Sequence, residues 1–207
     1  MKLPEQIVAN RIVLNGLKTP SFELAKQIYD AVEKSRERLR EWLPWVDKTH
    51  SAEDEFSNFL VEWCKVHWEN DEGFAYLIVS KETEEVLGCI DIFKVSEESK
   101  NGEIGFWLSD GAEGKGYMKE AVLALETEAF KAGINRIVIK NDTQNSRSMR
   151  VAEQCGYVLE GVMRQDAWDE YHQRLRDTNV WAKLKADWEK CSFYRPVCGC
   201  ICREVGQ

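Results

Sequence analysis

The feature that most constrains this chain is a glycine-spaced loop between a buried strand pattern and a helix pattern. The loop reads Ser109-Asp-Gly-Ala-Glu-Gly-Lys-Gly116. Its three glycines let backbone N–H groups turn inward, because no Cβ stands in the way. The helix that follows begins with unpaired N–H groups and the positive end of its dipole. This combination predicts a site for a phosphate or pyrophosphate group.

The segments on either side of the loop complete a strand–loop–helix–strand unit. Strands are predicted over residues 102–108 and 136–140, and Gly133 ends the helix. In the helix the apolar positions recur at helical spacing and leave four charged residues outward. The apolar positions are Met118, Ala121, Val122, Leu125 and Ala129, and the outward ones are Lys119, Glu120, Glu126 and Glu128. Neither the P-loop pattern nor the G-x-G-x-x-G fingerprint is present, so a nucleotide site of those two kinds is not indicated.

A family resemblance rests on this loop and on segments around it. Residues 113–118, Glu-Gly-Lys-Gly-Tyr-Met, resemble the acyl-CoA pyrophosphate loop of the GNAT acetyltransferases, whose pattern is Gln/Arg-x-x-Gly-x-Gly/Ala. The ribosomal-protein N-acetyltransferases of the RimJ/RimL type are the most similar branch. The resemblance covers residues 7–188, and Glu113 and Met118 depart from the usual pattern. The other matching segments are Arg40–Trp45, Glu103–Trp107, Asn145-x-x-Ser148, Cys155–Tyr157 and Leu159–Gly161.

The resemblance implies a fold, a domain and a co-substrate. The fold is the mixed α/β GNAT fold, in which helices flank a twisted, mostly antiparallel sheet whose two parallel central strands splay apart. It implies one GNAT domain over residues 1–188 and leaves residues 189–207 as a Cys-rich tail of unknown role. The implied co-substrate is acetyl-CoA, without a metal.

The resemblance also implies where acetyl-CoA binds. The thioester lies in the gap between the splayed strands, where a backbone N–H near Trp107 and Leu108 polarises its carbonyl. Asn145 binds the pantetheine arm, and Ser148 stabilises the leaving thiolate. Their i, i+3 spacing places both on one face of a first helical turn, although Asn145 can also be only a helix cap. The predicted cofactor-binding residues are Phe106, Trp107, Leu108, Glu113, Gly114, Lys115, Gly116, Tyr117, Met118, Asn145 and Ser148.

The general base is predicted to be Glu103, which precedes the loop on the central strand. Its carboxylate can take the amine proton directly or through water, or it can simply form a salt bridge. The second base of the family is a glutamate, and here Ala167 stands at its position with Asp166 beside it. Side chains alternate faces in a strand, so Asp166 cannot replace that glutamate if the backbone is extended. Catalytic roles are therefore predicted for Glu103, Ser148 and Asn145.

The acceptor side is predicted from aromatic residues. Trp42 and Trp45 flank Leu43-Pro44 and form either a rigid wall of the acceptor site or a buried staple between helix and loop. The predicted substrate-binding residues are Trp42, Trp45, Glu103, Asp166 and Tyr171. The remaining tryptophans are predicted to pack in the core or on the sheet, and they include Trp68, Trp168, Trp181 and Trp188.

The acceptor is predicted to be an amine. An α-amine has a pKa of about 7.7–8.0 and a lysine about 10.4, so near neutral pH more of the α-amine is nucleophilic. A protein N-terminus is therefore favoured, and by resemblance a ribosomal one. Two alternatives stay open. One is a small amine such as a polyamine or an aminoglycoside-like compound, and the other is a non-catalytic acyl-CoA-binding module, motivated by Glu113 and the missing second base.

Composition is consistent with one enzyme-sized domain in 207 residues. The net charge is −8, and residues 1–100 hold 13 Lys and Arg against 20 Asp and Glu. Such an acidic half disfavours nucleic acid and attracts cationic amines, or serves only solubility. Without an apolar run near 18 residues or a signal peptide pattern, the sequence predicts a cytoplasmic protein that does not span a membrane. A monomer or a homodimer is expected.

The seven cysteines fall into two groups. Cys64, Cys89 and Cys155 are predicted to be buried, reduced thiols. The other four occupy the tail, which is predicted to be an extended or frayed appendage. Their spacing lacks the C-x₂₋₄-C pairs of zinc ribbons. These tail cysteines are Cys191, Cys198, Cys200 and Cys202.

Periodicity and capping signals predict the other elements. The helices are expected over residues 21–33, 35–43, 51–69 and 146–155. The additional strands are expected over residues 7–17, 74–79, 86–95, 157–162 and 177–184.

Overall fold

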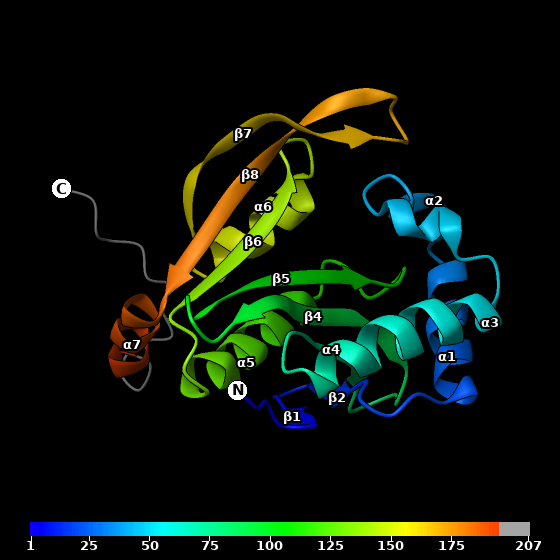
Figure 1. The fold of residues 1–207 in the computed structure, drawn as a ribbon, viewed down its shortest axis with the longest axis horizontal. Coiled ribbons are helices and arrows are strands. Elements are labelled where there is room, and N and C mark those ends of the chain that lie inside the picture. Colours follow the sequence, from blue (N-terminus) through cyan, green and yellow to red (C-terminus); the bar gives the residue numbers. More distant parts are fainter. Residues whose placement is uncertain (195–207) are drawn as a thin grey trace.

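An eight-stranded sheet organises the chain, of which the computed structural model describes residues 1–194 (Figure 1). The strand order is β1-β2-β3-β4-β5-β6-β8-β7. All neighbours are antiparallel except β5 and β6, which run parallel. The predicted mixed α/β fold with a mostly antiparallel sheet is therefore confirmed. The strands are β1 Gln6–Val8, β2 Ile12–Gly16, β3 Phe74–Ser80, β4 Val86–Ser96, β5 Asn101–Leu108, β6 Arg136–Asp142, β7 Val158–Asp169 and β8 Arg174–Leu184.

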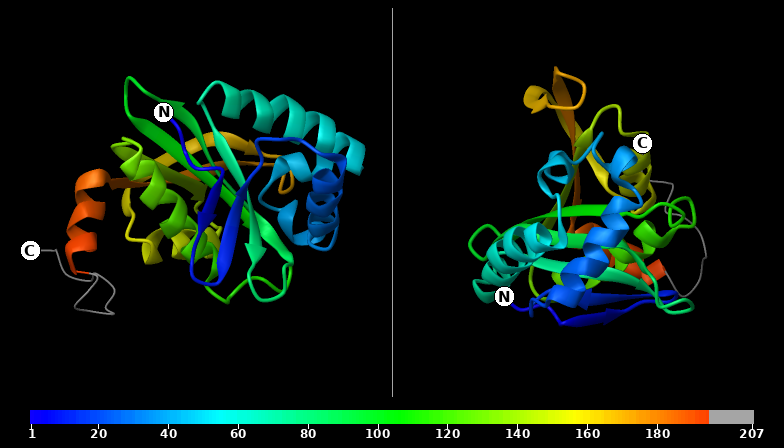
Figure 2. Two further views of the ribbon diagram at one scale, coloured as in Figure 1. Left: turned by 90° about the horizontal axis from the view of Figure 1, so that it is seen from below. Right: turned by 90° about the vertical axis from the view of Figure 1, so that its right-hand side faces the viewer.

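Helices cover both faces of this sheet (Figures 1 and 2). The first face buries Leu77, Cys89 and Trp107 against Ile28 and Leu60. Its cover consists of α1 Phe22–Glu33, α2 Arg36–Leu39, the 3₁₀-helix η1 Pro44–Lys48, α3 Ala52–Asp54, the π-helix η2 Glu55–Lys65 and α4 Val66–Glu69. The second face packs Ile90 and Ile104 against an apolar stripe of α5, and its cover consists of α5 Tyr117–Lys131, α6 Ser146–Gln154 and α7 Lys185–Tyr194.

The two parallel strands separate part of the way along their length. They pair only from Asn101 opposite Arg136 to Ile104 opposite Ile139. Beyond that point β5 stays with β4 as far as Leu108, while β6 stays with β8. In Figure 1 the β6, β8 and β7 group diverges from β5 and β4. This confirms the predicted splay of the central strands.

The N-terminal segment differs from the single strand predicted over residues 7–17. It forms a hairpin, in which Ile7 lies opposite Leu14 and the Ala9 N–H donates to the Ile12 carbonyl. Asn10 and Arg11 supply the turn. The apolar alternation continues across this turn, so periodicity alone does not reveal the break.

The helix predicted over residues 51–69 is present, but its middle part is π-helical. Leu60 is buried, and Phe59 and Trp63 pack against the same core. Glu55 is buried as well. A π-helix bonds i to i+5 and so redistributes its side chains around the axis. The α-helical spacing used for the prediction could not place Glu55 inside.

The C-terminal strands are longer than predicted and form an arm that stands away from the body (Figure 2, right). Trp181 on β8 is buried, whereas Trp168 on β7 is 52% exposed, so of the two predicted positions, core or sheet, Trp168 does not have the core one. Helix α7 crosses the domain boundary predicted at residue 188, and an extended conformation is therefore wrong for residues 189–194. The prediction for residues 195–207, with Cys198, Cys200 and Cys202, lies outside the described residues.

A buried ion pair joins α5 to β8, and it corrects the prediction that Glu126 points outward. Glu126 is 0% exposed and Lys183 is 3% exposed. The Lys183 ammonium lies 2.6 Å from the Glu126 carboxylate and donates to the Cys155 carbonyl at 2.8 Å. The apolar stripe of α5 is therefore interrupted by the carboxylate of Glu126, which pairs with Lys183 of the distant strand β8.

Replacing Lys183 by Met is expected to lower the free energy of unfolding by about 3–5 kcal/mol, because a buried carboxylate loses its counter-charge. Chemical denaturation measures this loss. The double variant Lys183→Met with Glu126→Gln should lose less than Lys183→Met alone. An equal or larger loss in the double variant would show that packing, rather than charge, dominates.

Candidate active site

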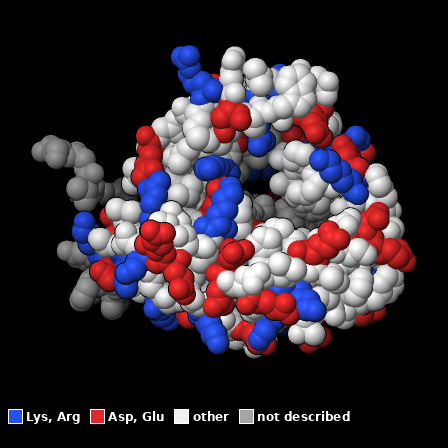
Figure 3. Space-filling model, viewed as in Figure 1, with Lys and Arg blue, Asp and Glu red and all other residues white. Residues whose placement is uncertain are grey.

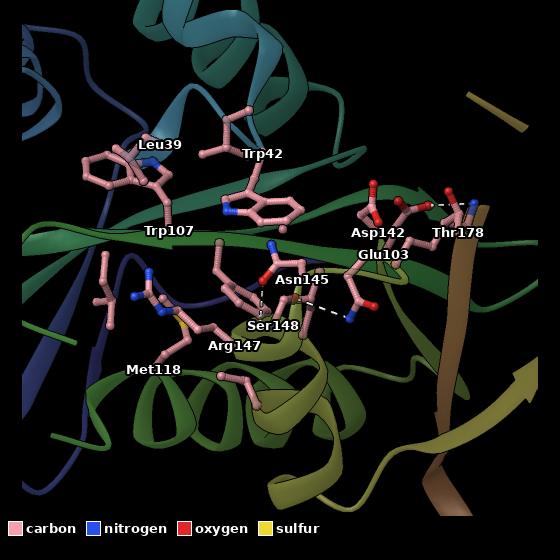
Figure 4. A pocket seen from close by; sticks show the side chains of 18 of the residues that line it. Leu39, Trp42, Glu103, Trp107, Met118, Asp142, Asn145, Arg147, Ser148 and Thr178 are labelled. Carbon is pink, nitrogen blue, oxygen red and sulfur yellow. Dashed lines mark hydrogen bonds and ion pairs between the residues drawn. The ribbon is translucent and has the colours of Figure 1, made fainter. Parts of the chain in front are cut away.

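A cavity of about 540 Å³ occupies the gap between the splayed strands. Figure 3 shows the molecule hollowed between the helices of the first face and the β7–β8 arm, with charged side chains of both signs around the rim. Residues from α2, β5, β6, α6 and β8 line the cavity. The close view shows Trp42 above the gap, Asn145, Arg147 and Ser148 on α6 and its cap below, and Glu103 toward β8 (Figure 4).

Ten predicted site residues line this cavity. They are Trp42, Glu103, Phe106, Trp107, Leu108, Glu113, Met118, Asn145, Ser148 and Asp166. Trp45 lines a neighbouring cavity instead, together with Phe106 and Trp107. The remaining predicted residues are not among the lining of either cavity, and these are Gly114, Lys115, Gly116, Tyr117 and Tyr171.

The glycine loop has the backbone conformation that a phosphate-binding turn needs. Gly111, Gly114 and Gly116 have φ of 82°, 72° and 80°. At Gly111 and Gly114 an added Cβ would meet nothing within 4 Å, so these positions favour glycine because of their φ rather than for lack of space. Gly116 caps α5, whose first N–H groups have no side-chain cap. Open backbone donors at a helix N-terminus fit a pyrophosphate.

Arg11, which comes from the β1–β2 turn, braces this loop from outside. Its guanidinium donates to the Lys115 carbonyl at 2.9 Å and to Glu120 at 2.8 Å, and it lies 4.6 Å from the centre of the Tyr117 ring. The predicted cofactor residues Lys115 and Tyr117 are thus held by a segment about a hundred positions away in the sequence. Arg11 thus fixes the loop through the Lys115 backbone and the Tyr117 ring.

The carboxylate of Glu113 is held by two arginines. Arg38 lies 2.9 Å and Arg147 3.4 Å from it. Arg38 also donates to the Leu108 carbonyl and to Asp110, both at 2.7 Å. The negative charge where the family has Gln or Arg is therefore offset locally. Because Arg147 is 66% exposed, its guanidinium is free to turn toward an anionic ligand.

Three polar side chains form a hydrogen-bond chain that ends in the gap. Asn179 donates to Asn141 at 3.0 Å, and Asn141 donates to the Ser148 hydroxyl oxygen at 3.3 Å. Ser148 therefore accepts from the sheet, and its own proton is available toward the cavity. Asn145 accepts the Ser148 N–H at 3.0 Å, which makes it the N-cap of α6 and leaves its amide N–H groups for a ligand.

The backbone of β5 offers further donors. Gly105 and Ser109 donate toward β4, to the Asp91 carboxylate and the Leu87 carbonyl. Because donors alternate along a strand, the N–H groups of Phe106 and Leu108 face the β6 side, where strand pairing has already ended. These two amides, rather than that of Trp107, point into the gap.

Glu103 forms salt bridges with two lysines, and a salt bridge was the alternative to the predicted role of Glu103 as general base. One of its carboxylate oxygens lies 3.1 Å from Lys94 and 3.3 Å from Lys140. The side chain is 15% exposed and lines the cavity. Two lysines therefore hold the carboxylate that the prediction assigns to the base. The role of Glu103 stays a prediction.

Of the predicted acceptor-side residues, Trp42 and Asp166 line this cavity together with Glu103. The Trp42 ring lies 6.3 Å from that of His172, and the Arg40 guanidinium lies 5.6 Å from the centre of the Tyr171 ring. Asp166 faces the cavity because the β7–β8 register shifts between Met163 and Ala167. Strand alternation therefore does not exclude it. The acceptor roles of Trp42, Asp166 and Tyr171 stay predictions.

A second cavity of about 560 Å³ adjoins the first, and the two share Leu43, Phe93, Gly105, Phe106 and Trp107. Two acidic residues that sequence reasoning missed line it, Glu55 and Asp91. Burial raises the pKa of Glu55 to about 7. Burial also raises the pKa of Asp91 to about 7, which the Gly105 N–H opposes and the charge of Glu103 favours. The available signal was an acidic residue within the apolar run Cys89-Ile-Asp-Ile-Phe93.

Glycine at 105 is required by this arrangement. Asp91 accepts the Gly105 N–H at 3.0 Å, and a Cβ at residue 105 would lie 2.6 Å from the same carboxylate oxygen. The prediction that Cys64, Cys89 and Cys155 are buried thiols is confirmed, since all three are free and buried.

Within residues 1–194, no helix is long and apolar enough to cross a membrane. Within the same residues, no cluster of three His, Cys, Asp or Glu side chains could hold a metal.

The fold and this gap match a known family. The family model described as acetyltransferase (GNAT) domain matches residues 16–158, and the chain belongs to the GNAT acetyltransferases. It is an acetyl-CoA-dependent N-acetyltransferase. The alternative of a non-catalytic acyl-CoA-binding module does not agree with this membership. The loop and helix N-terminus described above fit the pyrophosphate of acetyl-CoA.

Within the GNAT family, the chain is similar to enzymes of the RimJ/RimL type. The ribosomal-protein-serine acetyltransferase of Escherichia coli is 28% identical over 165 residues, which cover 77% of this chain and 86% of the relative. A solved structure of RimL, described as the ribosomal L7/L12 α-N-protein acetyltransferase in complex with coenzyme A, is 25% identical to this chain and superposes with a TM-score of 0.78. The match covers 87% of this chain and 98% of the RimL chain. A Salmonella typhimurium acetyltransferase that modifies the N-terminal serine of L7/L12 is 25% identical with a TM-score of 0.76, covering 87% and 99%.

Replacing Arg38 by Ala is expected to weaken acetyl-CoA binding by about tenfold, which corresponds to about 1.4 kcal/mol. Three contacts that fix residues 108–113 disappear with the guanidinium. Isothermal titration with acetyl-CoA measures the change, and Lys34→Ala, an exposed neighbour, is the matched control. Unchanged affinity in Arg38→Ala would show that the loop keeps its shape without this anchor.

The raised pKa of Glu55 predicts a pH dependence of stability. The folded state holds the proton up to about pH 7 and the unfolded state only to about 4.5. The resulting stabilisation is therefore full below pH 4.5 and is lost as the pH rises through 7. Glu55→Gln should gain up to about 3 kcal/mol of unfolding free energy relative to the unsubstituted protein between pH 5 and 8.5. Urea denaturation across that range measures it.

The exposed residue Glu53 provides the matched control for this experiment. Glu53→Gln should follow the pH dependence of the unsubstituted protein throughout. If Glu55→Gln and Glu53→Gln behave alike, the Glu55 carboxylate does not titrate near neutrality.

Proposed function

We propose that this acetyltransferase transfers the acetyl group to the N-terminal α-amine of a protein. The observation that carries the proposal is the similarity to enzymes whose names describe acetylation of ribosomal proteins. The open mouth of the cavity supports it. Trp42, which follows α2, and Asp166 of β7 both line the cavity, and the Trp42 ring contacts His172 of the β7–β8 turn. An extended peptide can enter between the first-face helices and the β7–β8 arm.

Different groups around the gap would bind acetyl-CoA and stabilise the charge that develops on its acyl oxygen. Acetyl-CoA supplies the acetyl group as a thioester when it is bound. The amides of the glycine loop and the start of α5 would hold its pyrophosphate, together with the exposed Arg147. The Phe106 and Leu108 N–H groups would donate to the acyl oxygen as negative charge develops there. These donors belong to a strand that is fixed by β4, so they need little rearrangement.

Two side chains, Ser148 and Glu103, would act on the leaving sulfur and on the proton of the acceptor amine. The Ser148 hydroxyl, oriented by Asn141, would donate a hydrogen bond to the departing sulfur and so stabilise its charge. Glu103 would accept the proton of the acceptor amine, directly or through water. The oxygen of Glu103 that is not engaged with the lysines is the one available for this step. Asn145 would bind the amide groups of the pantetheine arm.

The substitutions Ser148→Ala and Glu103→Gln test these roles. Each is expected to lower kcat by about tenfold to a hundredfold, with little change in acetyl-CoA affinity, because each acts mainly in the transition state. Thiol release with peptides that begin with Ser or Ala measures kcat, and titration measures affinity. Thr127→Ala is the control, since Thr127 bonds only to Leu123 of its own helix.

A second candidate acceptor is a small cationic amine, such as a polyamine or an aminoglycoside-like compound. The observation that favours it is a pair of carboxylates beside the gap, that of buried Glu55 and that of half-buried Asp91. A panel of peptides, polyamines and aminoglycosides at equal concentration distinguishes the two candidates by kcat/KM. Turnover confined to the small amines would overturn the N-terminal proposal.

A further inference from the structure

The second cavity combines aromatic walls with two acidic side chains, buried Glu55 and half-buried Asp91. Its rings form one pair and one group of three. The Trp45 and Trp107 centroids are 6.3 Å apart, those of Phe59 and Trp63 are 5.8 Å apart, and those of Trp63 and Phe93 are 6.4 Å apart. All five rings line the cavity. Faces of Trp and Phe attract cations, most strongly where water is excluded.

Glu55 lies at the first position of the π-helix η2, and its carboxylate has no partner. The residue is 3% exposed, lines the cavity, and makes no side-chain hydrogen bond or ion pair with any other residue from 1 to 194. A buried carboxylate without a partner is costly, and π-helical segments are frequent at functional sites. An internal packing role does not account for it, because an apolar side chain of similar size would pack there without that cost.

Asp91 adds a second acid group on the adjacent sheet face. One of its oxygens accepts the Gly105 N–H, which fixes the side chain, and the carboxylate lines the cavity. Glu55 on η2 and Asp91 on β4 thus line the same cavity from a helix and from the sheet.

We infer that this cavity is a subsite for a positively charged side chain of the acceptor, an ammonium or guanidinium carried near the reactive amine. This inference rests on the proposed function, since the cavity shares Gly105, Phe106 and Trp107 with the site of acetyl transfer. The cation would pair with Glu55 and Asp91, and its aliphatic stem would lie on the rings. The acceptor class is thus a peptide with Lys or Arg close to its N-terminus.

Lys48 is the one cationic residue among the lining residues of this cavity. It is exposed and forms no ion pair with Glu55 or Asp91, so it leaves both carboxylates open to a substrate cation. The inference therefore requires that removing Lys48 should not abolish cation binding.

The first test measures binding without turnover. n-Butylammonium is titrated against the protein with tryptophan fluorescence as the readout, since Trp45, Trp63 and Trp107 surround the cavity, and n-butanol is the uncharged control. The expected result is saturable quenching by the cation that Glu55→Gln and Asp91→Asn weaken by tenfold or more and that Glu53→Gln retains. Equal quenching by butanol, or equal affinity in Glu55→Gln, overturns the inference. So does binding that appears only in Lys48→Met, because Lys48 would then be the occupant.

The second test measures specificity with peptides that carry Lys or norleucine at position 2, 3 or 4. At one position the ratio of kcat/KM for Lys over norleucine should reach about ten in the unsubstituted enzyme and Glu53→Gln, and fall to about one in Glu55→Gln. A ratio near one at every position overturns the subsite while leaving peptide acetylation intact. Absence of turnover with all peptides, together with cation binding, overturns the proposed acceptor and not the cavity's preference for cations.

Discussion

The separation of β5 from β6 after four paired residues is the constraint on which the site depends. Each strand keeps its other neighbour, so the sheet opens without unravelling. The opening leaves the Phe106 and Leu108 N–H groups without strand partners, which is costly for buried backbone unless a ligand or water pairs with them. It also lets the Asn179–Asn141–Ser148 chain reach the gap from β8 and β6. A continuous sheet would have neither the donors nor the space.

Charges around the gap are arranged in balanced groups. Glu113 sits between Arg38 and Arg147, and Glu103 between Lys94 and Lys140. Such pairs keep the site polar without a strong net field at its walls. Glu55 stands apart from this pattern, because no cation balances it within the described residues. That contrast distinguishes the cavity between β5 and β6 from the neighbouring one.

The sequence was sufficient for the class of fold and for most of the gap. Glycine spacing predicted the loop, because positive φ at Gly114 and Gly116 leaves few other choices. The i, i+3 spacing of Asn145 and Ser148 predicted their shared place at the start of α6. Periodicity did not predict the burial of side chains whose position depends on contacts with distant parts of the chain. Glu126 lies inside only because Lys183 reaches it from β8, and Glu55 lies inside because its helix is π-helical. The register shift that turns Asp166 toward the cavity, with Gln165 at a φ of 51°, has no local sequence signal.

The strand order also has a consequence for how the site is made. The sheet places β8, residues 174–184, between β6 and β7. During synthesis β6 therefore waits for a partner that emerges only after α6 and β7 have left the ribosome. Until then β6 has an open edge, and Asn141 lacks the Asn179 amide that orients it. The half of the site that faces the glycine loop therefore cannot be complete before β8 has been synthesised, because both the outer neighbour of β6 and the Asn179 amide belong to it.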